Sequence, residues 1–101
     1  MQPGDIRIPA ADLTAFCAAA LAGAGAKDGD ARAVADHLVM ANLCGHDSHG
    51  AGLLPTYLRH VAEGLVDVHA VPEVIHDKGA ILKVAGHDAW GRIAGEFAMT
   101  A

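Results

Sequence analysis

Apolar residues recur at helical spacing in the first quarter of the chain, from Ala10 to about Ala24. Nearly every residue of this stretch is a good helix former. One face is defined by apolar residues three or four positions apart, namely Leu13, Phe16, Cys17, Ala20 and Leu21. Gly23 and Gly25 are typical of a helix C-terminus. The pattern therefore predicts a first helix whose apolar face lies in the core.

Two further stretches show the same spacing. A second helix is predicted over residues 31–43, with Asp28 or Asp30 as its N-cap. Its C-terminal half is apolar most of the way round, which indicates a helix covered on two sides, by another part of the protein or by another subunit. A third helix is predicted over residues 53–63, ending at Gly64. Its buried face is formed by Leu54, Leu58 and Val61.

The pattern changes after this third helix. Residues 73–76 and 80–84 read as two short strands around a turn at residues 77–79, and a further helix starts at about Ala89. One face of that helix carries Trp90, Ile93, Phe97 and Ala98. A short edge strand is also expected over residues 5–8. No GxGxxG segment follows a strand, so no Rossmann fingerprint is present.

These elements predict an α+β fold with two parts. Residues 1–70 form a three-helix segment, and residues 71–101 contribute a strand pair and the beginning of a further helix.

Of all residues, 52% are hydrophobic and 19% are charged, which favours a soluble globular chain over a disordered one. The net charge of −5 is spread over both halves, so no basic patch is available for nucleic acid.

The remaining composition indicates a reduced, cytoplasmic setting. No apolar run approaches the roughly 20 residues needed to span a bilayer, and no signal peptide is recognisable. No membrane association is therefore expected. Cys17 and Cys44 each lie in an apolar helical context, which predicts two buried thiols and no disulfide.

Groups that can move protons occur together in the loop after the second helix, GHDSHGAG at residues 45–52. Glycines surround His46, Asp47, Ser48 and His49, so a tight loop presents these side chains. Histidine changes charge nearest neutral pH and can exchange a proton with a reacting oxygen. From spacing alone, the two histidines can equally be solvated loop residues, or one of them can cap the preceding helix.

The segment from Asn42 to Gly64, NLCGHDSHGAGLLPTYLRHVAEG, resembles the signature of the malate/L-lactate dehydrogenase family. This family is distinct from the Rossmann-type lactate and malate dehydrogenases. The resemblance is carried by Asp47 to Gly50, Pro55, Tyr57 and Glu63-Gly64, and continues with Pro72, the run 80–84, Gly86, Asp88 and Gly91. It covers most of the chain after about Asp28. The GHDSHG form is most similar to the hydroxycarboxylate dehydrogenase branch.

The resemblance implies reversible hydride transfer between NAD or NADP and C2 of a small 2-hydroxy or 2-oxo acid. It assigns His49, with Ser48, to proton transfer, or alternatively His49 to contact with the nicotinamide. It also implies a homodimer. Since family members are several times longer than 101 residues, we expect an N-terminal piece in which residues 71–101 begin the cofactor-binding domain. Alone, this piece is expected to be inactive.

One departure from the family pattern bears on the substrate. Many members have an arginine three residues after the glycine of Ser-His-Gly, where it can bind a carboxylate with two hydrogen bonds. Here that position is Leu53. An apolar 2-oxo acid is therefore expected in preference to a dicarboxylate such as malate. Arg59 and His37 are expected at the surface, and Tyr57 in packing.

Two other functions are compatible with the residues. Cys44, His46 and His49 form a Cys-x-His-x-x-His cluster that could supply three metal ligands, although a structural zinc site needs four. A metal-binding module is therefore an alternative to the dehydrogenase. A chain without its cofactor domain could also act as a non-catalytic helical interaction module.

Overall fold

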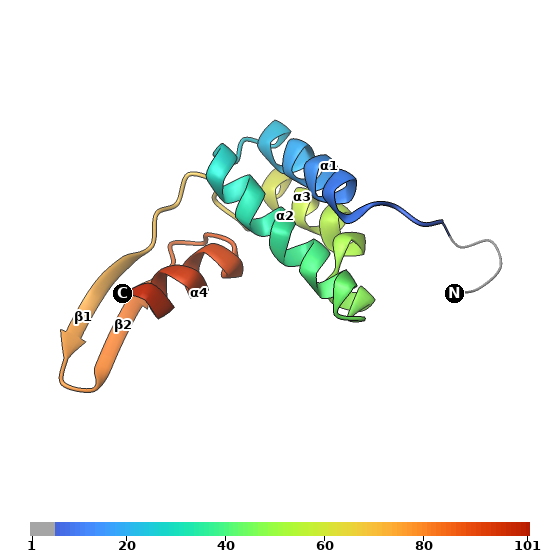
Figure 1. Ribbon diagram of the computed structural model, residues 1–101. Coiled ribbons are helices and arrows are strands. Elements are labelled where there is room, and N and C mark those ends of the chain that lie inside the picture. Colours follow the sequence, from blue (N-terminus) through green and yellow to red (C-terminus); the bar gives the residue numbers. More distant parts are fainter. Residues whose placement is uncertain (1–5) are drawn as a thin grey trace.

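Helices α1, α2 and α3 form one body, from which a β-hairpin projects (Figure 1). The computed structural model describes residues 6–101. The elements are α1 (Ala10–Gly23), α2 (Asp28–Leu43), the 3₁₀ turns η1 (Asp47–His49) and η2 (Ala51–Leu53), α3 (Leu54–Ala62), β1 (Glu73–Lys78), β2 (Ile81–Ala85) and α4 (Gly91–Thr100). The predicted α+β class and the order of elements are confirmed.

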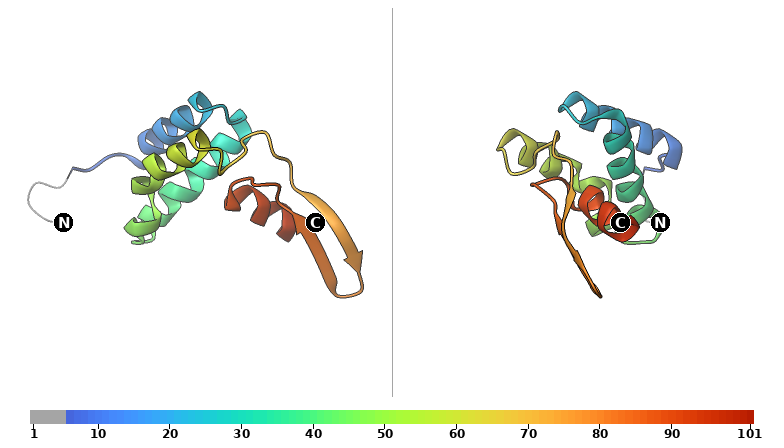
Figure 2. Two further views of the ribbon diagram at one scale, coloured as in Figure 1. Left: turned by 180° about the vertical axis from the view of Figure 1, so that it is seen from behind. Right: turned by 90° about the vertical axis from the view of Figure 1, so that its left-hand side faces the viewer.

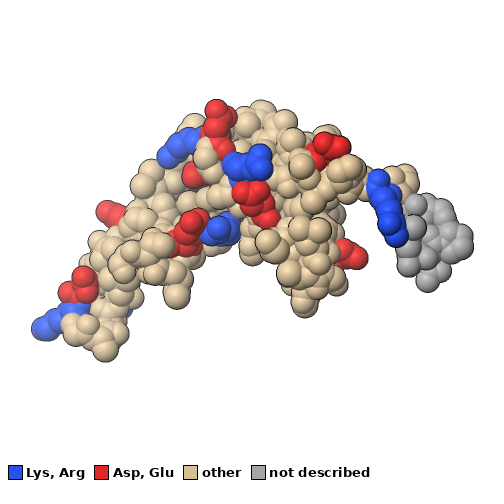
Figure 3. All heavy atoms as spheres, in the orientation of Figure 1, with Lys and Arg blue, Asp and Glu red and all other residues tan. Residues whose placement is uncertain are grey.

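The molecule is elongated, with extents of 55 × 29 × 20 Å. Both further views show the hairpin as a thin arm, with α4 lying between the arm and α2 (Figure 2). Lysines, arginines and carboxylates are interspersed on the face drawn in Figure 3. No helix within residues 6–101 is both long and apolar enough to cross a bilayer.

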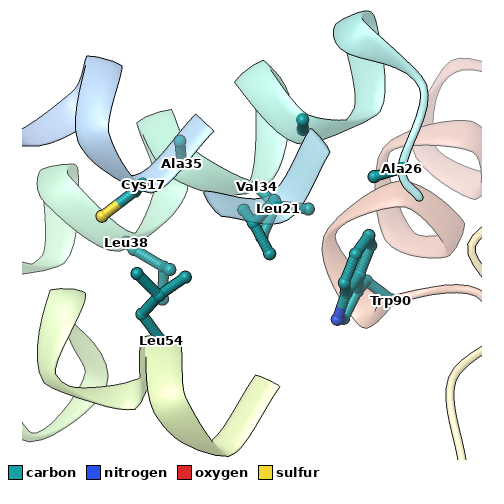
Figure 4. Packing of buried hydrophobic residues seen from close by; sticks show 9 residues of the cluster. Cys17, Leu21, Ala26, Val34, Ala35, Leu38, Leu54 and Trp90 are labelled. Atoms are coloured by element: carbon teal, nitrogen blue, oxygen red, sulfur yellow. The ribbon is translucent and has the colours of Figure 1, made fainter. Parts of the chain in front are cut away.

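A single buried cluster holds the helices together (Figure 4). Its members are Cys17, Leu21, Ala26, Ala31, Val34, Ala35, Leu38, Leu54 and Trp90. Leu54 of α3 is a member, and Leu58 and Val61 pack against the cluster, which confirms the predicted face of α3. Because Trp90 belongs to the same cluster, α4 is attached to the helical body. The boundary at residue 70 stays a prediction.

The sequence predicted Phe16 on the buried face of α1, and this prediction was wrong, because its side chain is 65% exposed. The buried line of α1 runs through Thr14, Cys17 and Leu21, and the Thr14 hydroxyl donates a hydrogen bond to the Ala10 carbonyl at 2.9 Å. Phe16 lies about 100° around the helix from Cys17. Since alanines surround α1 on every side, the apolar pattern did not distinguish these two directions.

The predicted C-terminal ends of the helices agree with the structure better than the predicted N-terminal starts. α1 and α3 are followed by Gly25 and Gly64, both at positive φ, as expected. α2 begins three residues early, at Asp28, and Lys27 occupies the N-cap without a side-chain hydrogen bond. Asp28 and Asp30 instead lie in the first turn, where a negative charge favours the helix dipole.

The predictions for the edge strand and for the hairpin each differ from the structure. The edge strand expected over residues 5–8 begins outside the described residues, and residues 6–8 form no strand. The hairpin is longer than expected, since β1 and β2 pair from Glu73–Ala85 to Lys78–Ile81, with an irregularity at Ile75. Its turn is therefore residues 79–80.

Two polar contacts fix the base of the hairpin. His87 Nε2 lies 2.8 Å from Glu73 Oε1, which links the second residue after β2 to the first residue of β1. The Asp67 N–H donates to the Asp88 carbonyl at 2.9 Å and joins the connector to the turn before α4. The hairpin faces remain open, with Ile75 and Ile81 each 60% exposed.

The two cysteines differ in exposure, so the prediction of two buried thiols was wrong for Cys44. Cys17 is fully buried, and burial raises the pKa of its thiol. Cys44 is exposed at the C-cap of α2. No disulfide forms, as predicted.

We expect the two thiols to react at very different rates with a disulfide reagent such as DTNB. Cys44 should react at once, whereas Cys17 requires an opening reaction, and every ~1.4 kcal/mol of opening free energy slows labelling about tenfold. A separation of at least ~100-fold is expected for an opening that costs a few kcal/mol. The Cys44→Ser variant isolates the slow phase. Equal rates for both thiols in the folded chain would contradict this burial.

Candidate functional site

A sharp change of direction at the end of α2 creates the histidine loop. Gly45 has a φ of 82°, a conformation that a residue with a side chain rarely adopts. Its N–H donates to the Asn42 carbonyl at 3.0 Å, and the His46 N–H donates to the Ala41 carbonyl at 2.8 Å. This pair of hydrogen bonds is the Schellman arrangement that ends helices. The chain after Gly45 therefore turns back along α2.

Two short 3₁₀ turns then carry the candidate residues. In η1 the His49 N–H donates to the His46 carbonyl at 2.9 Å, and the Gly50 N–H donates to the Asp47 carbonyl at 3.2 Å. In η2 the Leu53 N–H donates to the Gly50 carbonyl at 2.9 Å. These local bonds hold the backbone in a compact path, and the side chains of η1 are exposed.

Ser48 and His49 form a side-chain pair on η1. Ser48 Oγ lies 2.9 Å from His49 Nδ1, within hydrogen-bond distance. A hydroxyl can either donate to this nitrogen or accept from its N–H. In both cases the contact fixes the orientation of the ring and leaves Nε2 for another partner.

His49 also lines a cavity of about 360 Å³ along the end of α2. The cavity is lined by His37, Met40, Ala41, Cys44, His46 and His49. The apolar groups of Met40 and Ala41 form one wall, and imidazoles adjoin it. An apolar wall beside a few polar groups is usual for a site that holds a small organic molecule.

Of the other residues considered from the sequence, Leu53, Tyr57 and Arg59 lie outside this cavity and His37 lines it. Tyr57 packs against the buried cluster, as predicted, and Leu53 does the same. Arg59 is exposed and pairs with Glu63 at 3.8 Å, as expected for a surface residue. His37 is exposed, as predicted, although the cavity position was not foreseen.

The metal-binding alternative finds no geometric support. Within residues 6–101, no three His, Cys, Asp or Glu side chains are placed to hold a metal ion. Asp47, the acidic residue nearest to the histidines in sequence, accepts a hydrogen bond from Asn42 Nδ2 at 2.8 Å. Its carboxylate is therefore engaged with α2.

Asn42, in the last turn of α2, contacts the loop, and the sequence analysis gave it no role. Its side chain contacts Asp47 and, through Oδ1, the Ala51 N–H at 2.7 Å. The only signal in the sequence was its position at the start of the segment that resembles the family. That signal does not reveal which groups the amide contacts.

Comparison with known proteins identifies the family of the chain. Residues 8–101 match the family described as malate/L-lactate dehydrogenase. The chain belongs to this family. Escherichia coli (strain K12) hydroxycarboxylate dehydrogenase B is 37% identical over 93 residues, which are 92% of this chain and 26% of that protein. Pyrococcus abyssi malate dehydrogenase is 32% identical over 94 residues, or 93% of this chain and 26% of that protein.

Solved structures show the same relationship. The malate dehydrogenase of Pyrococcus horikoshii superposes with a TM-score of 0.93 at 32% identity, covering 98% of this chain and 28% of that one. As a member of the malate/L-lactate dehydrogenase family, the chain thus spans about a quarter of the length of these relatives. The resemblance inferred from the Asp47–Gly50 motif is confirmed.

Proposed function

We propose that this chain provides the proton-transfer part of an NAD(P)-dependent oxidoreductase that acts at C2 of 2-hydroxy and 2-oxo carboxylic acids. The observation that carries the proposal is the Ser48–His49 pair at the wall of the cavity. Family membership supports the class of reaction. The homodimer and the cytoplasmic location stay predictions.

The cavity suits the group that this chemistry requires. Met40 and Ala41 offer an apolar surface against which a flat aromatic ring can pack, next to the imidazole of His49. Nicotinamide, when bound, supplies or accepts the hydride at C2. The role of this chain is then to donate a proton to the substrate oxygen or to accept one from it.

His49 can perform that transfer through Nε2. In the reducing direction, C2 gains a hydride, the electron pair of the carbonyl moves to oxygen, and that oxygen takes a proton from the imidazolium of His49. In the tautomer whose Nδ1–H donates to Ser48 Oγ, Nε2 is the nitrogen that loses the proton and regains it from solvent. In the oxidising direction, the neutral ring accepts the proton of the hydroxy acid at Nε2. If His49 instead contacts the nicotinamide, Ser48 still sets the direction of the ring.

Leu53 favours a substrate with one carboxylate, because many family members have an arginine at this position. Among the described residues, neither Lys nor Arg lines this cavity. Arg59 and Arg92 pair with Glu63 and Glu96 on their own helices. The cation that binds the substrate carboxylate would then come from another part of the protein or from a second subunit.

The test is oxidation of reduced nicotinamide by the full-length protein that contains this chain. Pyruvate-like monocarboxylic 2-oxo acids are expected to be reduced with a higher kcat/KM than oxaloacetate. Leu53→Arg should raise kcat/KM for oxaloacetate by roughly tenfold, because a well-placed guanidinium binds a carboxylate with two hydrogen bonds.

Leu53 packs against the buried cluster, so the thermal unfolding midpoint of this variant is measured alongside, and Leu53→Met serves as the uncharged control. The 101-residue chain alone is expected to be inactive. Absence of 2-oxo acid reduction with both NADH and NADPH in the full-length protein would contradict the proposed function.

A further inference from the structure

A single side-chain amide joins α2 to both ends of the turn that carries Ser48 and His49. Asn42 Nδ2 donates to Asp47 Oδ1 at 2.8 Å, immediately before Ser48. Asn42 Oδ1 accepts from the Ala51 N–H at 2.7 Å, two residues after His49. The chain between these two contacts is residues 47–51, which is all of η1 and the first residue of η2.

The orientation of the amide follows from its partners. A carboxylate can only accept hydrogen bonds, so Asp47 requires the NH₂ end of Asn42. A backbone N–H can only donate, so Ala51 requires the oxygen end. Each partner fixes the same orientation independently. While residue 47 is a carboxylate, the side chain at position 42 must present a donor and an acceptor side by side, so neither alanine nor a carboxylate there can make both contacts.

Gly50 shows how closely the amide fits the turn. A Cβ placed on Gly50 would lie 2.4 Å from Asn42 Cγ and Oδ1 and 2.5 Å from Nδ2. Real side chains do not approach so closely, so any residue larger than glycine would displace the amide. The turn is thus held by two hydrogen bonds and by direct packing of Asn42 on the Gly50 backbone.

We propose that Asn42 is a positioning residue that fixes the direction in which His49 faces the cavity. This inference rests on the proposed function, in which His49 must reach a substrate oxygen. The local hydrogen bonds of η1 shape the turn, but all of them are within residues 46–50. Asn42 is the side chain that ties the turn to the helix whose last two turns form the cavity wall.

The test exchanges the two groups of the Asn42–Asp47 pair in the full-length enzyme. Asn42→Asp places two carboxylates against each other, and kcat should fall about 10- to 100-fold because displacing a catalytic group by about 1 Å can cost 100-fold. Asp47→Asn keeps the hydrogen bond, since Nδ2 can donate to an amide oxygen, so a loss of at most about threefold is expected.

The double variant Asn42→Asp/Asp47→Asn provides the decisive comparison. Its carboxylate on α2 can accept from both the Ala51 N–H and the amide introduced at position 47, so both hydrogen bonds return with the roles of the pair reversed. We expect kcat to recover to within about threefold of the Asp47→Asn variant, as for two coupled residues in a double-mutant cycle. Thermal unfolding midpoints separate lost catalysis from lost folding.

Two results would overturn the positioning role. One is wild-type kcat in the Asn42→Asp variant, and the other is a double variant as impaired as that single one. If the wild-type protein reduces no 2-oxo acid, the proposed function fails, and the ring is then followed by ¹⁵N NMR of histidine. A shifted His49 signal in Asn42→Asp that returns in the double variant supports positioning, and an unshifted signal refutes it.

Discussion

Replacing His49 by alanine is expected to lower kcat for 2-oxo acid reduction by about 10²- to 10⁴-fold, the usual contribution of a positioned acid-base group. The imidazole is exposed on η1, lines the cavity and is held through Nδ1 by Ser48 at 2.9 Å. Alanine removes Nε2, which is the group proposed to exchange the proton. The change is measured in steady-state kinetics of the full-length protein.

The affinity for reduced nicotinamide separates the two roles proposed for His49. If His49 carries the proton, the Kd of the cofactor should change little while kcat falls. If His49 contacts the nicotinamide instead, the loss should lie mainly in that Kd. His60→Ala serves as the control, because His60 lies on α3 and does not line the cavity. Equal kcat values and equal cofactor Kd values for wild type and His49→Ala would exclude both roles.

Trp90→Ala is expected to lower the free energy of unfolding of this chain by about 3–5 kcal/mol, the usual cost of removing a large buried aromatic ring. Trp90 is 6% exposed and lies in the same buried cluster as Ala26 and Val34 (Figure 4). Small domains have a total stability of about 5–15 kcal/mol, so a large share of the stability would be lost. Urea unfolding followed by far-ultraviolet circular dichroism measures the change.

Trp90→Phe and Phe16→Ala are the matched controls. The Trp90 indole N–H is buried without a hydrogen-bond partner among the described residues. Phenylalanine keeps most of the ring and removes this donor, so Trp90→Phe should cost clearly less than Trp90→Ala. Phe16 is an exposed aromatic residue, and its loss should stay within about 0.5 kcal/mol. A loss from Phe16→Ala as large as that from Trp90→Ala would contradict the packing.

Much of the fold could be predicted because apolar spacing and glycine positions agree with each other. The face of α3 was found from Leu54, Leu58 and Val61, which belong to the buried cluster or pack against it. Phe16 and Cys44 were misassigned because they lie in alanine-rich or uniformly apolar surroundings. In such stretches the sequence does not show which direction meets another helix, since alanine is compatible with core and surface alike.

The candidate site was predictable in identity and not in geometry. Ser48 and His49 are neighbours in sequence, so a shared turn was expected, and their catalytic roles stay predictions. The contacts of Asn42 depend on the path of the chain after Gly45, which brings Asp47 and Ala51 back against α2. The spacing of apolar residues along the sequence does not predict that the chain returns to α2.

The hairpin has a consequence for handling the 101-residue chain. Within the described residues, β1 and β2 form a sheet of only two strands, so both have an outer row of backbone amides and carbonyls without a neighbouring strand. Ile75 and Ile81 add apolar surface to this arm. At high concentration, we therefore expect the arms of separate molecules to pair edge to edge and the 101-residue chain to aggregate through the arm.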